Sequence, residues 1–277
     1  MIRLDIKKTY KLYIGGAFPR TESGRYYKLE HKGQLVANLC LASRKDFRNA
    51  VVAARKAQDG WASKTGYNRG QILYRIAEML EGRAAQFVEE LIAVGAKPQA
   101  AKQEVMDAID TWVYYAGWCD KYQQLASSVN PVASPHFNFT APEPTGVVAA
   151  VAPADSGLRG LTRTLAPIVA SGNTVIALAA EQFGHVALSL AEVIHSSDVP
   201  GGVVNLLTGN PEELLPHMAG HMDVDAIALA LALANDGATK SAAAANVKRV
   251  VTLRATDGLE NITDFVEYKT TWHPIGA

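Results

Sequence analysis

The second half of the chain alternates short apolar runs with stretches in which apolar residues recur at helical spacing. The runs are rich in Val, Ile, Leu and Ala, which is typical of strands buried on both faces. Strands alternating with helices predict an α/β fold whose parallel sheet carries helices on both faces. The five expected strands are Gly146–Ala152, Thr174–Leu178, Val203–Leu207, Ala226–Leu233 and Arg249–Leu253. The expected helices between them are Leu161–Ala170, Ala187–Ile194, Glu212–Ala219 and Gly237–Ala245.

The first half has a helical pattern. Ser43 followed by Asp46 resembles a capping box, with Asp in place of the usual Glu or Gln. The helix that it opens has apolar residues on roughly one face, namely Phe47, Val51, Ala54 and Trp61. Further helices are expected over Tyr67–Glu81, over Ala84–Val94 and after Pro98, where a first-turn proline is favourable. The last of these carries Val105, Ile109, Val113 and Tyr114 in its apolar stripe, and its aromatics Trp112, Tyr114, Tyr115 and Trp118 are expected to pack in the core.

Extended segments are expected outside this alternation. Lys11–Ile14 and Arg25–Leu29, joined through Gly15-Gly16, predict an N-terminal hairpin. Ser127–Pro144 predicts a second hairpin, with its prolines at strand ends or on an edge. Ile262–Trp272 predicts a final strand.

Composition narrows the function classes. The 277 residues include 27 basic and 27 acidic side chains, so the formal net charge is zero and a nucleic-acid partner is not expected. The two cysteines, Cys40 and Cys119, favour a reducing, cytoplasmic location over a disulfide framework. No apolar run reaches membrane-spanning length, and the charged segment Met1–Gly16 does not resemble a signal peptide.

Several ordered segments together resemble the aldehyde dehydrogenase superfamily. The resemblance covers nearly the whole chain and implies a Rossmann-like cofactor-type domain with a small antiparallel oligomerisation sheet. The segments that carry it are Leu12–Ala17 (LYIGGA), Ala53–Trp61 (AARKAQDGW), Tyr114–Trp118 (YYAGW), Pro142–Pro153 (PEPTGVVAAVAP), Gly172–Val175 (GNTV), Val199–Leu207 (VPGGVVNLL), Val250–Leu253 (VVTL) and Val266–Ile275 (VEYKTTWHPI).

The cofactor positions that the resemblance implies depart from the family pattern. The family's Lys-Pro-Ser-Glu segment corresponds to Leu178-Ala179-Ala180-Glu181, so only Glu181 is left as a vestigial ribose contact. The Phe-Thr-Gly-Ser turn near the pyrophosphate corresponds to Leu229-Ala230-Leu231-Ala232, which has lost the glycine and the hydroxyls. Pro211 stands where a second glycine is usual and has no N–H for a phosphate. The resemblance therefore implies no bound cofactor.

The catalytic positions depart as well. The oxyanion-stabilising Asn corresponds to Asp155, whose carboxylate repels an oxyanion and is more typical of a loop or helix cap. The general-base Glu corresponds to Arg254, which stays protonated and is expected to pair with Asp257 or Asp264. Neither cysteine falls at the nucleophile position, and the large catalytic domain that follows Leu253 in the family is missing. The histidines, including His217 and His221, lack metal-ligand spacing, so no metal site is expected.

The predicted organisation has four parts. Residues 1–126 form an N-terminal hairpin and helices, 127–144 an oligomerisation hairpin, 145–258 the degraded cofactor-type domain, and 259–277 a C-terminal oligomerisation strand. In the family, the oligomerisation sheet extends the catalytic domain of a neighbouring subunit. The resemblance therefore implies that Val129–Ala141 and Phe265–Trp272 bind a full-length aldehyde dehydrogenase paralogue, which would supply the missing domain.

Three hypotheses for function follow. The first is a non-catalytic structural or regulatory subunit of such a heteromer. The second is an NAD(P)-dependent aldehyde oxidoreductase with residual activity or cofactor binding. The third is a scaffold or small-ligand module whose degraded cofactor cleft is lined by Leu178, Leu229 and Leu231. Nucleotide titration and the state of the purified protein discriminate among them.

Overall fold

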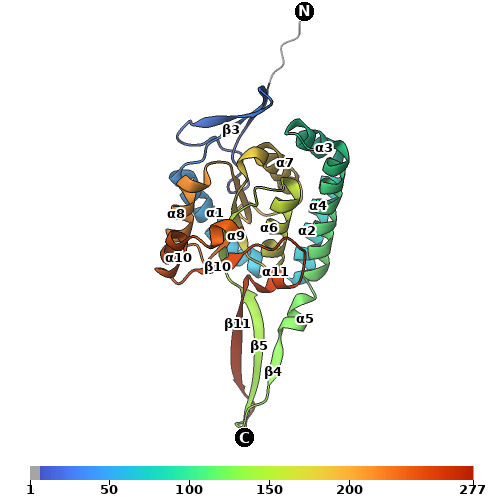
Figure 1. The fold of residues 1–277 in the computed structure, drawn as a ribbon. Coiled ribbons are helices and arrows are strands. Elements are labelled where there is room, and N and C mark those ends of the chain that lie inside the picture. Colours follow the sequence, from blue (N-terminus) through green and yellow to red (C-terminus); the bar gives the residue numbers. More distant parts are fainter. Residues whose placement is uncertain (1–6, 277) are drawn as a thin grey trace, which may run out of the picture.

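The computed structural model describes residues 7–276, so residues 1–6 of the charged opening segment lie outside the described residues. Helices surround a central sheet, a small N-terminal sheet covers one end, and a narrow three-stranded sheet extends from the other (Figure 1). No helix in this described part has the length and apolar character needed to cross a membrane.

The central sheet has five strands in the order β10-β9-β6-β7-β8, and every neighbouring pair is parallel. This confirms the sheet predicted from the apolar runs. The strands are β6 (Val147–Val151), β7 (Thr174–Leu178), β8 (Val204–Leu207), β9 (Ala226–Leu229) and β10 (Arg249–Thr252). The strand expected over Ala226–Leu233 ends early, because the helix-forming residues Leu231–Ala234 make the short helix α9.

Two hydrophobic cores lie on opposite faces of the sheet. Val147, Ala149 and Val151 of β6 belong to one core, while Val148 and Ala150 belong to the other, as strand alternation requires. The first core is closed by α1 (Arg44–Ala62), α8 (Pro211–Gly220) and α10 (Gly237–Ala244). The second is closed by α2 (Gly66–Glu81), α3 (Ala84–Ala93), α4 (Pro98–Trp118), α6 (Leu158–Ala170) and α7 (Gly184–His195).

The start of α1 confirms the capping box. The Ser43 side chain accepts from the Asp46 N–H at 3.3 Å, and the Asp46 carboxylate accepts from the Ser43 N–H at 2.8 Å. The predicted core residues of α1 are at most 1% exposed: Phe47, Val51 and Ala54 pack in the first core, and Trp61 packs in the second.

The predicted N-terminal hairpin is wrong in its pairing. The hairpin joins β2 (Tyr26–His31) to β3 (Gln34–Cys40) through Lys32-Gly33, which both have positive φ. β1 (Thr9–Tyr10) lies parallel to β3. The segment Lys11–Ile14, which was expected to pair in the hairpin, instead runs along the central sheet, where Tyr13 bridges to Leu206 of β8.

The aromatic residues of α4 do not all pack in the core. Trp112 and Tyr115 are fully buried, whereas Tyr114 is 38% and Val113 is 40% exposed. At 100° per residue, the buried stripe through Val105, Ala108, Ile109, Trp112 and Tyr115 leaves positions 113 and 114 on the outer side. Expecting Tyr114 and Val113 in the core is therefore wrong.

The three-stranded sheet, termed the arm, has the order β11-β5-β4 and is antiparallel throughout. Its strands are β4 (Ser128–Asn130), β5 (His136–Pro144) and β11 (Val266–Pro274), which confirms the second predicted hairpin. Pro131 and Pro135 lie in the connection between β4 and β5. The final strand was expected from Ile262 but begins at Val266, because residues 260–263 form the short helix α11 (Glu260–Thr263), whose Ile262 is buried. The helix α5 (Tyr122–Ala126) leads from α4 into the arm.

A single buried amide joins the arm to the body. Asn173 is fully buried before β7, and its Oδ1 accepts from the N–H of Gly146 at 2.6 Å. Its Nδ2 donates to the carbonyl of Phe265 at 2.8 Å and to Ser171 Oγ at 2.7 Å. One side chain therefore fixes the entrances to β6 and β11, which explains the polar Gly-Asn-Thr segment within an apolar region.

Candidate functional site: the carboxyl edge of the sheet

The carboxyl ends of parallel strands are the edge at which α/β proteins bind ligands. The three predicted site residues all follow such ends: Asp155 comes after β6, Glu181 after β7 and Arg254 after β10. The loops after β6 and β7 meet, because the Gln182 side chain donates to the carbonyl of Ala154 at 2.6 Å. Arg254 instead lines a separate hollow with Thr263 and Asp264. The structure therefore groups the first two positions and separates the third.

A shallow hollow of about 500 Å³ lies between β2 and the loops after β6 and β7. It is lined by Tyr27, Lys28, Ala154, Ala180 and Glu181 among others. The Tyr27 hydroxyl is already used, because it donates to the carbonyl of Glu181 at 3.1 Å, and burial raises the pKa of this phenol. Glu181 itself begins the single 3₁₀ turn η1 (Glu181–Phe183) and is exposed to solvent.

The N-terminus of α6 is occupied by a carboxylate from the same chain. Glu104 of α4 accepts from the N–H groups of Leu158 at 2.8 Å and of Arg159 at 3.3 Å. Ser156 Oγ accepts from the N–H of Gly160 at 2.9 Å. A helix N-terminus attracts anions, and here Glu104 already supplies the negative charge. Sequence inspection did not find Glu104, because 54 residues separate it from its partner Leu158.

Asp155 lies in an exposed bend and does not cap this helix, since the residue at the N-cap is Gly157. Of the two uses expected for Asp155, the structure thus shows the loop and not the cap.

The cleft expected from Leu178, Leu229 and Leu231 is not formed. Leu178 and Leu229 are fully buried in the core beneath α1 and α8. Leu231 points outward from α9 and is 64% exposed. The error arises because β9 ends at Leu229, so the next two apolar residues leave the sheet. At the neighbouring α8, Pro211 occupies the first turn, and Asn210 caps the helix by accepting from the Glu212 N–H at 2.8 Å.

Arg254 is held in an ion pair with Asp264, and its guanidinium also contacts Asn261 Oδ1 at 3.4 Å. The hydrogen bond to the Asp264 carboxylate raises the pKa of Arg254, which is therefore a fixed cation and cannot accept a proton. Of the two partners expected from the sequence, Asp264 is thus the one that pairs. Asp257 pairs with Arg163 of α6 instead.

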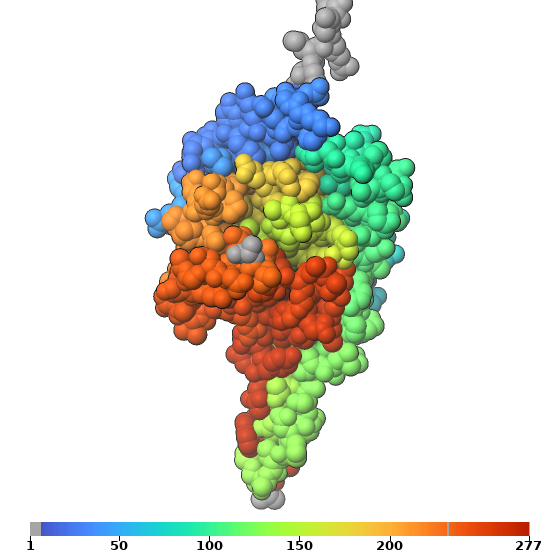
Figure 2. Space-filling model, in the orientation of Figure 1, coloured from blue at the N-terminus to red at the C-terminus, as the bar shows by residue number. Residues whose placement is uncertain are grey.

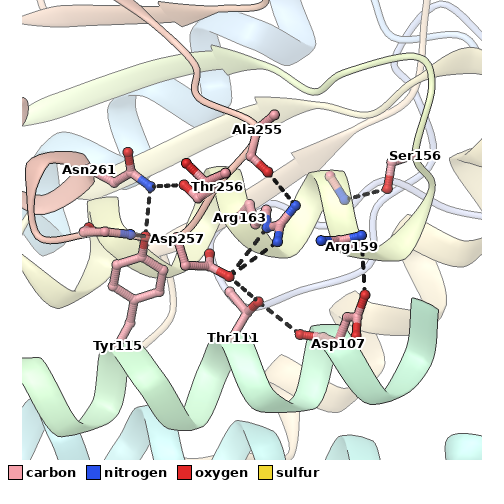
Figure 3. A network of polar contacts seen from close by, with 12 residues as sticks. Asp107, Thr111, Tyr115, Ser156, Arg159, Arg163, Ala255, Thr256, Asp257 and Asn261 are labelled. Atoms are coloured by element: carbon pink, nitrogen blue, oxygen red, sulfur yellow. Dashed lines mark hydrogen bonds and ion pairs between the residues drawn. The ribbon is translucent and has the colours of Figure 1, made fainter. Parts of the chain in front are cut away.

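Residues 254–259 connect β10 to α11 and are termed the junction. Figure 3 shows that side chains from α4 and α6 converge on its backbone. Arg163 donates to the carbonyl of Ala255 at 2.5 Å and reaches the Asp257 carboxylate at 3.4 Å (Figure 3). Thr111 donates to the same carboxylate at 3.2 Å. These contacts hold the junction against the helices that flank the second core.

The far end of the junction is fixed by a second set of bonds. Asn261 donates to the carbonyl of Thr256 and to the Tyr115 hydroxyl, both at 2.8 Å (Figure 3). The Tyr115 hydroxyl also accepts from the N–H of Gly258 at 3.3 Å, and burial raises the pKa of this phenol to about 12. Sequence inspection missed this network, because its members come from three separate segments.

We predict that Arg163→Met lowers the free energy of unfolding by about 2 kcal/mol, because Asp257 loses its cationic partner and the Ala255 carbonyl loses its donor. Urea unfolding measures this loss. Arg75→Met is the matched control, because Arg75 pairs with Glu78 on the exposed side of α2 and its loss is expected to cost less than about 0.5 kcal/mol. Equal losses in the two variants would show that the junction is not held as described.

The remaining candidate chemistry is absent from this edge among the described residues. Both cysteines are buried, and burial raises the pKa of the Cys119 thiol to about 12, so Cys119 stays protonated. Within residues 7–276, no group of three His, Cys, Asp or Glu side chains is placed to hold a metal ion. His217 lies in the last turn of α8, and His221 follows that helix with its ring against Phe47.

Comparison with known proteins identifies relatives of this chain. The sequence model of the aldehyde dehydrogenase family matches residues 22–253. The chain is 33% identical to cytosolic 10-formyltetrahydrofolate dehydrogenase of Mus musculus, with 90% of this chain and 28% of that protein covered. It is 31% identical to an aldehyde dehydrogenase of Alternaria alternata, with 86% and 49% covered.

Solved structures agree with the sequence match. The NAD⁺ complex of an aldehyde dehydrogenase from Bacillus cereus superposes with a TM-score of 0.82 at 25% identity, and 88% of this chain and 50% of that chain are covered. The chain thus spans half or less of the length of these relatives. With the family match over residues 22–253 and this shared fold, the chain belongs to the aldehyde dehydrogenase family.

Proposed function

We propose that this chain is a non-catalytic aldehyde dehydrogenase-type subunit that assembles with a full-length aldehyde dehydrogenase. The observation that carries the proposal is the junction. Residues 254–259 pass directly from the central sheet to α11 and the arm, and Arg163, Thr111, Tyr115 and Asn261 hold them in place. A connection anchored on both sides is a formed structural element, and no catalytic domain intervenes at this point of the chain.

The residues at the carboxyl edge do not fit a nicotinamide cofactor. Leu178 is buried where the resemblance implies a ribose-binding Lys, and Leu231 stands where the family has a phosphate-binding glycine. Glu104 fills the N-terminus of α6, so those N–H groups are already paired. Glu181 alone among these positions provides an exposed carboxylate. These residues therefore support no reaction step through such a cofactor.

The general-base position supports the same conclusion. Proton abstraction needs a group that can accept a proton at working pH, and Arg254 is a cation paired with Asp264. The two cysteines are buried away from solvent, so neither offers a thiolate to an aldehyde. The arm remains available for assembly, and we propose that its segments Val129–Ala141 and Phe265–Trp272 contact the partner.

Co-purification tests the proposal. The tagged chain is co-expressed with a full-length aldehyde dehydrogenase from the same source, and the product is analysed by size exclusion with mass measurement. We expect a heteromer. Trp272→Asp on the arm should weaken it, whereas Tyr67→Asp on α2 should not, although both aromatics are more than half exposed. A homodimer that ignores every full-length relative would overturn the proposal.

Nucleotide titration separates this proposal from a working oxidoreductase. Calorimetry of the purified chain with NAD and with NADP is expected to show no heat of binding. Binding in the micromolar range would instead support the oxidoreductase hypothesis.

A further inference from the structure

The outer edge of β11 is a long unpaired strand edge. β11 runs from Val266 to Pro274 and pairs only with β5 among the described strands. The opposite edge of the arm, β4, has only three residues and is followed by Pro131. Figures 1 and 2 show the arm extending as a narrow projection away from the helices, so the body covers this edge at its base, where Arg249 donates to the Val266 carbonyl, and leaves Tyr268–Trp272 open. An exposed edge of this length pairs readily with another strand.

The backbone groups on this edge can be assigned from the hydrogen bonds at its two ends. Beyond either end of the ladder, Thr145 donates to the carbonyl of Phe265 at 3.1 Å, and Ile275 donates to the carbonyl of Pro135 at 3.2 Å. Residues 265 and 275 therefore face β5. Successive residues of a strand direct their backbone N–H and C=O groups to opposite edges. The backbone groups of Tyr268, Thr270 and Trp272 therefore face outward, away from β5.

The sequence of β11 is complementary to itself about Thr270. We propose that two copies of this chain pair antiparallel along β11, with a twofold axis at Thr270. In this register Tyr268 lies opposite Trp272 of the second copy on one face, and Glu267 lies opposite His273 on the other. Each contact occurs twice, as an isologous interface requires. The outward groups of Tyr268, Thr270 and Trp272 then form about six hydrogen bonds across the axis, counted at two for each pair of facing residues.

Neighbouring registers are less favourable. A twofold axis perpendicular to the sheet must pass between two copies of the same residue, since residues facing each other across strands point to the same side. An axis at Lys269 places two lysines opposite each other. An axis at Thr271 sets Lys269 opposite His273 and brings Pro274, which has no N–H, into the ladder. The Thr270 axis sets no like charges opposite each other, and it places Pro274 at the end of the ladder, opposite Val266, whose carbonyl already accepts from Arg249.

The shape of the molecule permits this pairing. β11 starts at Val266, where the arm leaves the body, and ends at Pro274, toward the tip of the arm (Figure 1). In the antiparallel pair, the tip of one arm comes opposite the base of the other, so the two bodies lie at opposite ends. Tyr268 and Trp272 are 53% and 57% exposed in the single chain and would cover each other across the axis.

This inference rests on β11 and does not depend on the proposed heteromer. The two assemblies use one edge, so a full-length partner that takes β11 must displace the second copy. Self-pairing would thus keep the edge covered until such a partner is present.

Cysteine cross-linking of the whole chain, without any partner, tests the register. Residues facing each other in a hydrogen-bonded pair have Cα atoms about 5.5 Å apart, which suits a disulfide. Thr270→Cys is therefore expected to form a covalent dimer under mild oxidation. Thr271→Cys is the matched control, because its two copies would lie about 8 Å apart and should not cross-link. Cys40 and Cys119 are buried and give the background.

Sedimentation of the whole chain provides a second measurement. Thr270→Lys places two like charges on the axis and should weaken self-association about fivefold. Thr271→Glu faces Lys269 of the second copy and should strengthen it about threefold. A monomer at every concentration, or equal cross-linking of the Thr270 and Thr271 variants, would overturn the proposal, whatever the outcome of the co-purification.

Discussion

Asn173→Ala is expected to lower the free energy of unfolding by about 3–4 kcal/mol, because it removes three hydrogen bonds from a fully buried amide. The Gly146 N–H, the Phe265 carbonyl and the Ser171 hydroxyl would each lose a partner inside the protein. For a chain of this size, the melting temperature should fall by about 6–12 °C. Differential scanning calorimetry and urea unfolding measure the two quantities.

Asn210→Ala is the matched control for this prediction. Asn210 caps α8 at the surface through one hydrogen bond, so its loss should cost about 1 kcal/mol. Because Asn173 links the body to the arm, its replacement should also raise amide exchange in β11 more than in β8. A loss below about 1 kcal/mol at Asn173 would contradict its role as the joint.

Trp61→Ala is expected to cost about 4–5 kcal/mol, the second large effect. Trp61 is 1% exposed in the second core, and its indole N–H donates to the carbonyl of Val169 in α6 at 3.0 Å. The variant would lose both the buried volume and this hydrogen bond. Urea unfolding followed by circular dichroism measures the change.

Replacing each of two buried tryptophans with phenylalanine separates the contribution of the buried volume from that of the hydrogen bond. Trp112 is also fully buried, but its indole N–H has no hydrogen-bond partner among the described residues. Trp61→Phe should therefore cost about 1–2 kcal/mol more than Trp112→Phe, since the volume removed is the same. Equal costs would show that the bond to Val169 contributes little.

The central sheet could be predicted because its information is local. Each strand is a short apolar run, and the helices between them follow an apolar spacing that needs no distant partner. The capping box at Ser43 and Asp46 is local for the same reason. The prediction failed where a strand and a helix follow each other within one apolar run. Residues Ala226–Leu233 are apolar throughout, so their pattern does not show that the strand ends at Leu229 and a helix follows.

For the candidate site, the sequence predicted where the residues lie in the fold but not which side chains they contact. Resemblance located Asp155, Glu181 and Arg254 at the ends of strands, which the structure confirms. It did not reveal that Glu104 fills the α6 terminus or that Asp264 pairs with Arg254 in preference to Asp257. The first contact joins segments that are distant in the sequence, and the second is a choice between two nearby carboxylates. Local sequence patterns predict neither.

The hydrogen bonds of Asn173 and the junction, residues 254–259, together connect the body to the arm as two separable parts of the fold. Arg254 at the start of the junction forms an ion pair with Asp264, which directly follows α11, so the exit from β10 and the approach to β11 lie within reach of one side chain. When the exit and entry points of a chain are neighbours, a domain can be gained or lost between them at little cost in loop entropy. A domain inserted within residues 254–259 would enter and leave the chain on one side of the fold, at the expense of the contacts that Arg163 and Asn261 make with the junction.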